Sequence, residues 1–346
     1  MEDRGRERKR SSRVAVLGAG AFGTALALHA HRQGCTVRVW SHEASLPARV
    51  AADRENAPYL EGVPLPADLV FDHDLKSVLE GADLVLFVVP AQFVRAVAVR
   101  ARPHLPTDAW IGCCAKGIEH DSLALMSAVL EEVLPEAVER QVFLSGPTFA
   151  RELAEGRLMD ITAASRNPAA AEGVQCILHA SAFRVYTSDD PIGVEVAGAL
   201  KNVIAIACGA VDELGLGLSA RGSLIARGLA EMARIGVRLG AHPVTFLGLS
   251  GVGDLVLTCT GDLSRNRTLG RQIARGERAK DILARQAAIA EGYYTAGPAH
   301  LLAERLSVDA PIIEQVHHVL QGERSVEEAL ARLVSRESKS EFEGIL

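Results

Sequence analysis

The feature that most constrains this chain is a G-x-G-x-x-G turn near its amino end, made by Gly18, Gly20 and Gly23. An apolar run at residues 14–17 enters the turn, and an alanine-rich helical stretch at 24–33 leaves it. Strand, turn and helix N-terminus in this order favour dinucleotide binding over a plain glycine-rich turn, because free N–H groups and the helix dipole hold a pyrophosphate. We expect Gly18 to turn the chain sharply, Gly20 to admit the phosphates, and Gly23 to let the helix pack on the strand.

Short apolar segments alternate with helical ones through the rest of the first half. We predict strands at residues 14–17, 36–40, 83–89, 110–115 and 141–144. Alternation of this kind predicts an α/β domain with a parallel, doubly wound sheet of the Rossmann type. Ligands of such sheets bind beyond the carboxyl ends of the strands, where Lys116, Gly146 and Thr148 fall.

The pattern becomes almost wholly helical from about residue 195, with alanine, leucine and isoleucine dominant. We therefore predict three parts. Residues 1–12 form a basic arm, residues 13–193 a dinucleotide-binding domain, and residues 194–346 an all-α substrate domain.

Composition excludes several classes of protein. The formal net charge of −6 argues against general affinity for nucleic acid or anionic membranes. The apolar stretches read from the sequence are too short to cross a bilayer, so we expect a cytoplasmic protein without stable membrane insertion. Six cysteines and 11 histidines show no metal-ligand spacing, so we expect free thiols and no metal.

Lys201 is the sharpest candidate for chemistry, since it is a lone lysine in the apolar stretch 196–207. Either its stem covers apolar surface while the ammonium reaches water, or the side chain is held in a site. Burial would lower its pKa and make it a usable acid/base near neutral pH. Glu195 and Asn202 share a helix face and bring polar groups near it.

Asp254 follows three glycines, Gly248, Gly251 and Gly253, at the start of a predicted helix. The simple interpretation is an N-cap aspartate. The alternative places its carboxylate in the site, where it binds a substrate hydroxyl or orients Lys201.

The run Ser264-Arg265-Asn266-Arg267 offers hydroxyl, guanidinium and amide donors in succession. Arginine with such neighbours suits a phosphate, because its planar fork makes bidentate bonds. An exposed polar turn is the alternative interpretation.

Taken together, these segments resemble the bacterial type of NAD(P)-dependent glycerol-3-phosphate dehydrogenase over roughly residues 13 to 325. Several motifs in the same order carry the resemblance: the glycine turn, Ala115-Lys116-Gly117, Ser145-Gly146-Pro147-Thr148-Phe149-Ala150, Lys201-Asn202-Val203-Ile204-Ala205, Arg227-Gly228-Leu229-Ala230-Glu231-Met232, Gly253-Asp254-Leu255 and Ser264-Arg265-Asn266.

The resemblance implies interconversion of dihydroxyacetone phosphate and sn-glycerol 3-phosphate, with Lys201 as proton donor and acceptor. It also implies a homodimer whose product supplies phospholipid synthesis. It implies substrate contacts from Lys116, Gly146, Thr148, Lys201, Asp254, Ser264, Arg265 and Asn266. It implies cofactor contacts from Gly18, Gly20, Ala21, Phe22, Gly23, His42, Lys116, Ala150, Arg265, Ile289 and Glu291.

Two segments depart from the family pattern. Ala21-Phe22 replaces the usual serine and aromatic pair, so phosphate binding rests on backbone N–H groups. Leu218-Ser219-Ala220 replaces the usual Gly-Asn-Ala.

The end of the second strand bears on cofactor choice. Ser41 and His42 place no carboxylate at the expected ribose position, although Glu43 follows. A carboxylate there binds the 2′-hydroxyl of NAD, whereas Ser41 and His42 could donate to a 2′-phosphate. We therefore expect NADP to be favoured and NAD tolerated.

Two other functions fit parts of the sequence. A related two-domain hydroxyacid dehydrogenase would share the fold without phosphate dependence. A dinucleotide-sensing protein would bind the cofactor without catalysis, but it would need no acid/base group such as Lys201.

Overall fold

The computed structural model describes residues 12–285, 289–337 and 340, which form two compact units. The first unit contains the described residues up to Ala115 together with Met126–Pro191. The second contains Lys116–Leu125 and the described residues from Ile192 onward. The ten residues 116–125, which the sequence boundaries placed in the first domain, therefore pack with the helical unit.

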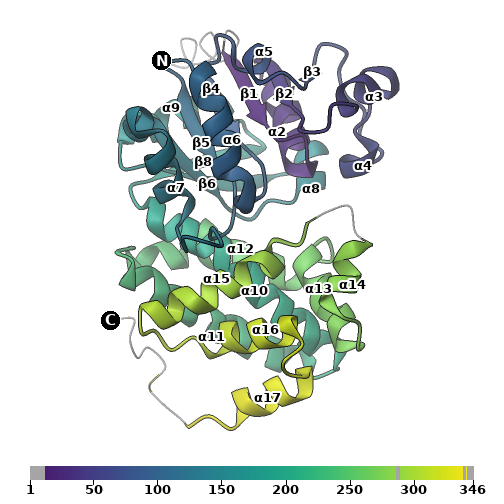
Figure 1. Ribbon diagram of the computed structural model, residues 1–346, viewed down its shortest axis with the longest axis vertical. Helices are drawn as coiled ribbons and strands as arrows, with labels where there is room; N and C mark the ends of the chain where they lie inside the picture. The colour runs from purple at the N-terminus through teal and green to yellow at the C-terminus, as the bar shows by residue number, and fades with distance from the viewer. Residues whose placement is uncertain (1–11, 286–288, 338–339, 341–346) are drawn as a thin grey trace. The chain divides into compact units, whose positions relative to one another are not determined.

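The first unit is built on an eight-stranded sheet of order β3-β2-β1-β4-β5-β6-β7-β8 (Figure 1). Its strands are β1 (Arg13–Leu17), β2 (Thr36–Trp40), β3 (Val70–Asp72), β4 (Leu84–Phe87), β5 (Trp110–Cys113), β6 (Gln141–Ser145), β7 (Met159–Ala164) and β8 (Phe183–Ser188). The β1 and β4 strands are almost entirely apolar, as expected of parallel strands covered on both faces.

The predicted fold class is confirmed, with one correction to the all-parallel sheet. The β6 and β7 strands pair antiparallel, with Leu144 opposite Ala163. The link between them contains only the short helix α8 (Ala150–Ala154). It does not return to the amino ends of the parallel strands, so β7 runs in the opposite direction to β6. The strands β3, β7 and β8 were not predicted from the sequence.

Helices cover both faces of the sheet. The helix α2 (Ala21–Arg32) contacts both α8 and α9 (Pro168–Leu178), and α2 is drawn in purple in Figure 1. The helices α5 (Leu75–Leu79), α6 (Val94–Ala101) and α7 (Met126–Val133) form a second contiguous set. Two short helices, α3 (Leu46–Asp53) and α4 (Ala57–Leu60), lie in the excursion after β2.

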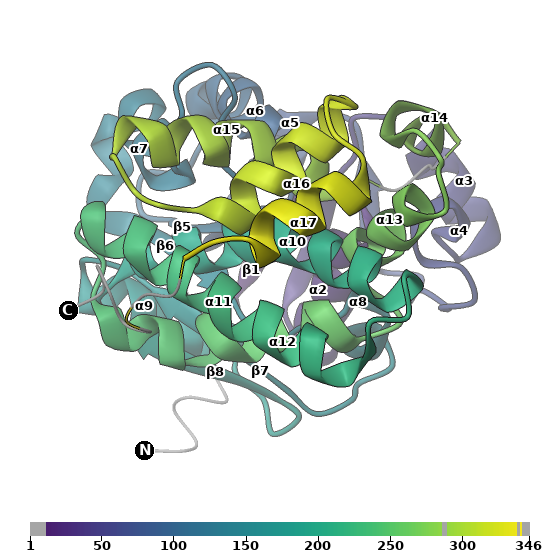
Figure 2. The same cartoon turned by 90° about the horizontal axis from the view of Figure 1, so that it is seen from below.

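The described part of the second unit is helical (Figures 1 and 2). Its helices are α10 (Pro191–Glu213), α11 (Gly217–Arg238), α12 (Asp254–Thr260), α13 (Arg265–Ala274), α14 (Ala279–Ala284), α15 (Glu291–Arg305), α16 (Pro311–Gln321) and α17 (Val326–Val334). The apolar core gathers around the inner part of α10, and Ile118 and Leu125 of the inserted segment belong to it.

A close approach of two helices positions the candidate site residues. A Cβ added at Gly270 of α13 would lie 1.9 Å from the Ile206 oxygen of α10, and one at Gly209 would lie 2.0 Å from the Arg267 oxygen. Glycine at both points lets α10 and α13 touch backbone to backbone. This contact lies in the second half of α10, and at the start of α13 the Asn266 amide reaches Asn202, the neighbour of Lys201.

The length and apolarity of α10 would suffice for a membrane span, but 94% of its most apolar stretch is buried within the protein, as in a core helix. The six cysteines are all free thiols, and all but Cys176 are buried.

Candidate active site

Lys201 is buried in the middle of α10, with 6% of the residue exposed. Its Nζ donates hydrogen bonds to Asp254 Oδ1 at 2.5 Å and to Thr258 Oγ1 at 2.7 Å. Of the two interpretations left open by the sequence, the ammonium is therefore held inside the protein and does not reach along the surface to water.

Asp254 lies between two lysines. Its carboxylate is fully buried and also accepts from Lys116 Nζ at 2.7 Å, on Oδ2. Gly253 occupies the N-cap position of α12, so Asp254 is the first helical residue and its side chain is free to engage both ammonium groups. The dipole at the start of α12 further stabilises the negative charge.

The charges of this cluster set the proton affinity of Lys201. The pKa of Lys201 is lowered from 10.5 to about 8: burial lowers it most, the charge of Lys116 also lowers it, and Asp254 raises it. Two ammonium groups against one carboxylate leave a net positive charge. An ammonium with a pKa near 8 is mostly protonated at pH 7 and can still exchange its proton in catalysis.

Thr258 completes the cluster and was missed in the sequence. Its hydroxyl donates to the backbone oxygen of Asp254 at 2.7 Å and accepts from Lys201. The available signal was its spacing of four residues from Asp254, which places both on one face of a helix.

A second buried group links three helices beside Lys201. The Asn266 amide donates to Asn202 Oδ1 at 2.9 Å, and Asn266 Oδ1 accepts from the Gly292 N–H at 2.9 Å. These bonds tie α13 and α15 to α10. Glu291 begins α15 directly beside Gly292, and Ile289 lies two residues before Glu291.

The run 264–267 is not a simple exposed turn, because its members differ in burial. Ser264 is buried as the N-cap of α13, where its hydroxyl accepts from the Arg267 N–H at 3.3 Å. Arg267 is buried between Asp212 and Asp262, at 2.7 and 2.8 Å. Arg265 is exposed, so it is the arginine of this run that can meet a ligand.

The glycine turn of the first unit fits a bound pyrophosphate. Gly18 has φ +128°, and a Cβ at Gly23 would lie 1.9 Å from the Gly18 oxygen. Apart from its chain neighbours and the backbone of its own helix, no atom of the described residues lies within 4 Å of a Cβ placed at Gly20. Gly20 is also the N-cap of α2, which has no side-chain cap and no acidic residue in its first turn. The N–H groups of Ala21 and Phe22 therefore begin a helix end suited to an anion.

The remaining predicted residues of the first unit lie after strands. His42 is exposed just beyond β2 and meets the Trp40 ring edge-on, with 6.1 Å between ring centroids. Gly146 and Thr148 follow β6, and the Thr148 hydroxyl donates to the Gly146 oxygen at 3.3 Å. Ala150 is the first residue of α8.

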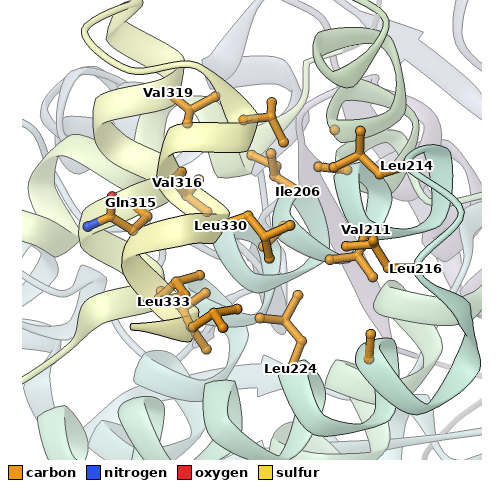
Figure 3. Close-up of a pocket in the computed structure, with 18 of the residues that line it drawn as sticks. Ile206, Val211, Leu214, Leu216, Leu224, Gln315, Val316, Val319, Leu330 and Leu333 are labelled. Atoms are coloured by element: carbon orange, nitrogen blue, oxygen red, sulfur yellow. The ribbon is translucent and has the colours of Figure 1, made fainter. Parts of the chain in front are cut away.

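An apolar cavity of about 220 Å³ lies elsewhere in the second unit, among α10, α11, α13, α16 and α17 (Figure 3). Side chains such as Ile206, Val316 and Leu330 point into it. None of the candidate site residues lines this cavity, so it is separate from the lysine cluster. Within the described ranges, no group of three or more His, Cys, Asp or Glu side chains is arranged to hold a metal ion.

Comparison with known proteins gives concordant matches along the chain. Residues 13–171 match the family model of the NAD-dependent glycerol-3-phosphate dehydrogenase N-terminus, and residues 190–331 match that of its C-terminus. Glycerol-3-phosphate dehydrogenase [NAD(P)+] of Syntrophotalea carbinolica is 47% identical over 331 residues, covering 95% of this chain and 99% of the relative. The enzyme of the same name from Citrifermentans bemidjiense is 46% identical over 332 residues, covering 96% and 99%.

Solved structures give the same result. The crystal structure of glycerol-3-phosphate dehydrogenase from Coxiella burnetii superposes with a TM-score of 0.90 at 36% identity. The match covers 94% of this chain and 100% of the other.

Proposed function

This chain belongs to the NAD-dependent glycerol-3-phosphate dehydrogenase family and is an NAD(P)-dependent oxidoreductase acting on a CH–OH group, and from this premise we propose that Lys201 is its proton donor and acceptor. The reaction is the interconversion of dihydroxyacetone phosphate and sn-glycerol 3-phosphate. The observation that carries the residue assignment is the buried Lys201 ammonium, bonded to Asp254 and with a pKa lowered to about 8.

A bound nicotinamide cofactor supplies or takes up the hydride at the carbon that bears the oxygen. During reduction, negative charge grows on the carbonyl oxygen, and Lys201 stabilises that charge and delivers its proton. In the reverse direction, neutral Lys201 removes the hydroxyl proton. Lys116 adds a second positive charge, and Asp254 holds both lysines in place through its two oxygens.

Substrate orientation rests on the start of α13. The exposed Arg265 guanidinium suits the phosphate, and the spare N–H of the buried Asn266 amide adds a donor. Binding the phosphate away from the reacting carbon orients the carbonyl toward Lys201. The proposed cofactor contacts are Gly18–Gly23, His42, Ala150, Ile289 and Glu291, with Gly146 and Thr148 beside the substrate.

Three further parts of the proposal go beyond the family assignment. NADP is the favoured cofactor and NAD is tolerated. The protein is cytoplasmic, and its working form is a homodimer, which size-exclusion chromatography with light scattering tests directly.

The test of the Lys201 assignment is Lys201→Met, which keeps an apolar stem in the core but removes the proton. We expect kcat for dihydroxyacetone phosphate to fall by at least ~100-fold, the usual size of an acid–base contribution, with unchanged Kd for NADPH. Lys280→Met is the matched control, because Lys280 is exposed on α14 of the same unit. Near-normal turnover by the Lys201 variant would refute the assignment.

The same assay separates the other two functions. A hydroxyacid dehydrogenase would oxidise NAD(P)H with a plain keto acid and show no preference for dihydroxyacetone phosphate. A dinucleotide sensor would bind NAD(P)H and reduce neither dihydroxyacetone phosphate nor the keto acid.

A further inference from the structure

The segment that follows β2 lies directly beside the glycine turn. The Trp40 backbone oxygen at the end of β2 accepts from the Gly18 N–H at 3.1 Å, and Trp40 pairs with Leu17 in the sheet. In a fold of this type, the residues just beyond this strand meet the adenosine ribose of the dinucleotide. Here those residues are Ser41, His42 and Glu43.

The Glu43 carboxylate is engaged at both oxygens by other side chains. The Tyr59 hydroxyl donates to Oε1, and Arg49 Nη2 donates to Oε2 at 3.2 Å. The bond to Glu43 raises the pKa of Tyr59 to about 12, so the phenol stays protonated and remains a donor. Glu43 is therefore held by a donor on one side and has its charge offset by a guanidinium on the other.

The Ser41 hydroxyl is used within its own turn. It is buried, donates to the Glu43 backbone oxygen at 3.0 Å and accepts from the Glu43 N–H at 3.1 Å. Its role in the structure is to shape the chain that presents Glu43. The sequence-based idea that Ser41 donates to a ligand phosphate thus gives way to Arg49 as the source of donors.

Arg49 lies in α3, and 49% of its side chain is exposed, against 41% for Glu43. An exposed ion pair of this kind shifts an equilibrium by at most about fivefold. The guanidinium can therefore leave the single charge of Glu43 for a phosphate, which carries more charge and accepts two N–H bonds in parallel.

We propose that Arg49 is the residue that recognises the 2′-phosphate of NADP, and that its exchangeable pair with Glu43 lets the same site accept NAD. When the phosphate is present, Arg49 turns to it and leaves Glu43 to Tyr59. When the ribose carries a free 2′-hydroxyl, Arg49 stays on Glu43 and offsets its charge. This inference rests on the proposed function and deepens it, because it assigns the cofactor preference to particular side chains.

The experiment measures binding to the full-length protein by calorimetry with two probes, 2′,5′-ADP and 5′-AMP, which differ by the 2′-phosphate. Arg49→Gln should weaken 2′,5′-ADP by about 10- to 100-fold, the range for one lost charged hydrogen-bond partner, and change 5′-AMP less than about twofold. Arg49→Lys should restore part of the loss, because it restores the charge without the planar fork. Glu43→Gln should strengthen 2′,5′-ADP by removing a nearby negative charge.

Arg102→Gln is the matched control. Arg102 forms an exposed pair with Glu136 at 3.0 Å in the same unit, but it precedes β5, at the amino ends of the parallel strands, whereas the residues after β2 lie at their carboxyl ends. Its loss should leave both probes unchanged.

The inference is overturned if Arg49→Gln keeps the affinity for 2′,5′-ADP, or if it weakens both probes equally, as a purely structural residue would. The ratio of kcat/KM for NADPH over NADH should fall in parallel with the affinity ratio. A parent protein that discriminates the probes through Arg49 but does not turn over dihydroxyacetone phosphate would refute the proposed function and leave this inference standing.

Discussion

Replacing Asp254 with asparagine removes the carboxylate between Lys116 and Lys201 while keeping a side chain of similar shape. In the native protein, Asp254 raises the pKa of Lys201, whereas burial and the charge of Lys116 lower it to about 8. In the variant, burial and Lys116 still lower the pKa of Lys201, but the carboxylate that raises it is gone. Its Lys201 pKa therefore falls below about 8.

The size of the fall follows from the contact distance. A carboxylate within about 4–6 Å commonly moves a pKa by about 1 to 3, which brings Lys201 to about 5–7 in the variant. At pH 7 the protonated fraction then drops from about nine-tenths to between a half and a hundredth, because each pKa step is a tenfold change in the equilibrium. Reduction of dihydroxyacetone phosphate, which consumes that proton, should slow by about the same factor.

The assay is kcat/KM for reduction between pH 5.5 and 9.5, followed by NADPH absorbance. For the parent, activity should decline as pH rises through about 8, where Lys201 loses its proton. For Asp254→Asn the decline should move to lower pH, and the oxidation of sn-glycerol 3-phosphate should reach its plateau at lower pH. Asp262→Asn is the control, because Asp262 is exposed and bonded to Arg267 in the same unit.

The position of the decline is the decisive readout. A variant that merely misfolds or binds substrate poorly loses activity at every pH without moving the curve. An Asp254→Asn profile that declines at the same pH as the parent would refute the electrostatic role assigned to this carboxylate.

The remaining predictions concern a buried acid and the glycine turn. Burial raises the pKa of Glu231 to about 7, although its carboxylate caps α16 by accepting the N–H groups of Ile312 and Ile313. The folded protein is therefore stabilised as pH falls from about 7 to 4.5, by about 3 kcal/mol for the pKa shift from 4.5 to about 7. Urea unfolding should show this pH-dependent stability in the parent and not in Glu231→Gln, and a stability difference between the two that does not change with pH would contradict it. Gly20→Ala should keep the melting temperature and weaken NADPH binding, because its Cβ meets no protein atom but enters the phosphate approach. Gly23→Ala should lower the melting temperature, since its Cβ would clash with the Gly18 oxygen at 1.9 Å, and equal melting temperatures for the two variants would contradict this reading.

Much of the fold followed from local pattern. The strand, turn and helix around the first glycines were predictable because the turn geometry admits few residues, and five strands were visible as apolar runs. The β3 strand has only three residues, too few to show a period. The β8 strand has alternating apolar and polar residues in its first half, Phe183 to Tyr186, and this pattern would have allowed its prediction.

The candidate site was harder to predict from the sequence, because packing decides which of its side chains are available to a ligand. Arg265 and Arg267 are two residues apart and have the same side chain, yet only the structure shows that Arg267 is bonded to two aspartates, Asp212 and Asp262. Arg49 was not among the residues predicted from the sequence, because only its bond to Glu43 places it beside the end of β2. In each case a contact distant in sequence decided which side chain was available.

The chain enters the helical unit, leaves it and returns, since residues 116–125 belong there although sheet strands flank them on both sides. A fragment that begins at residue 192 would therefore lack Lys116, and it would expose the part of the helical core that Ile118 and Leu125 cover in the full chain. Recombination between homologous enzymes faces the same constraint. A single crossover near residue 192 would join the Lys116 of one parent to the Lys201 and Asp254 of the other. To keep all three charged residues from one parent, a chimera must therefore take residues 116–125 from the same parent as the helical unit.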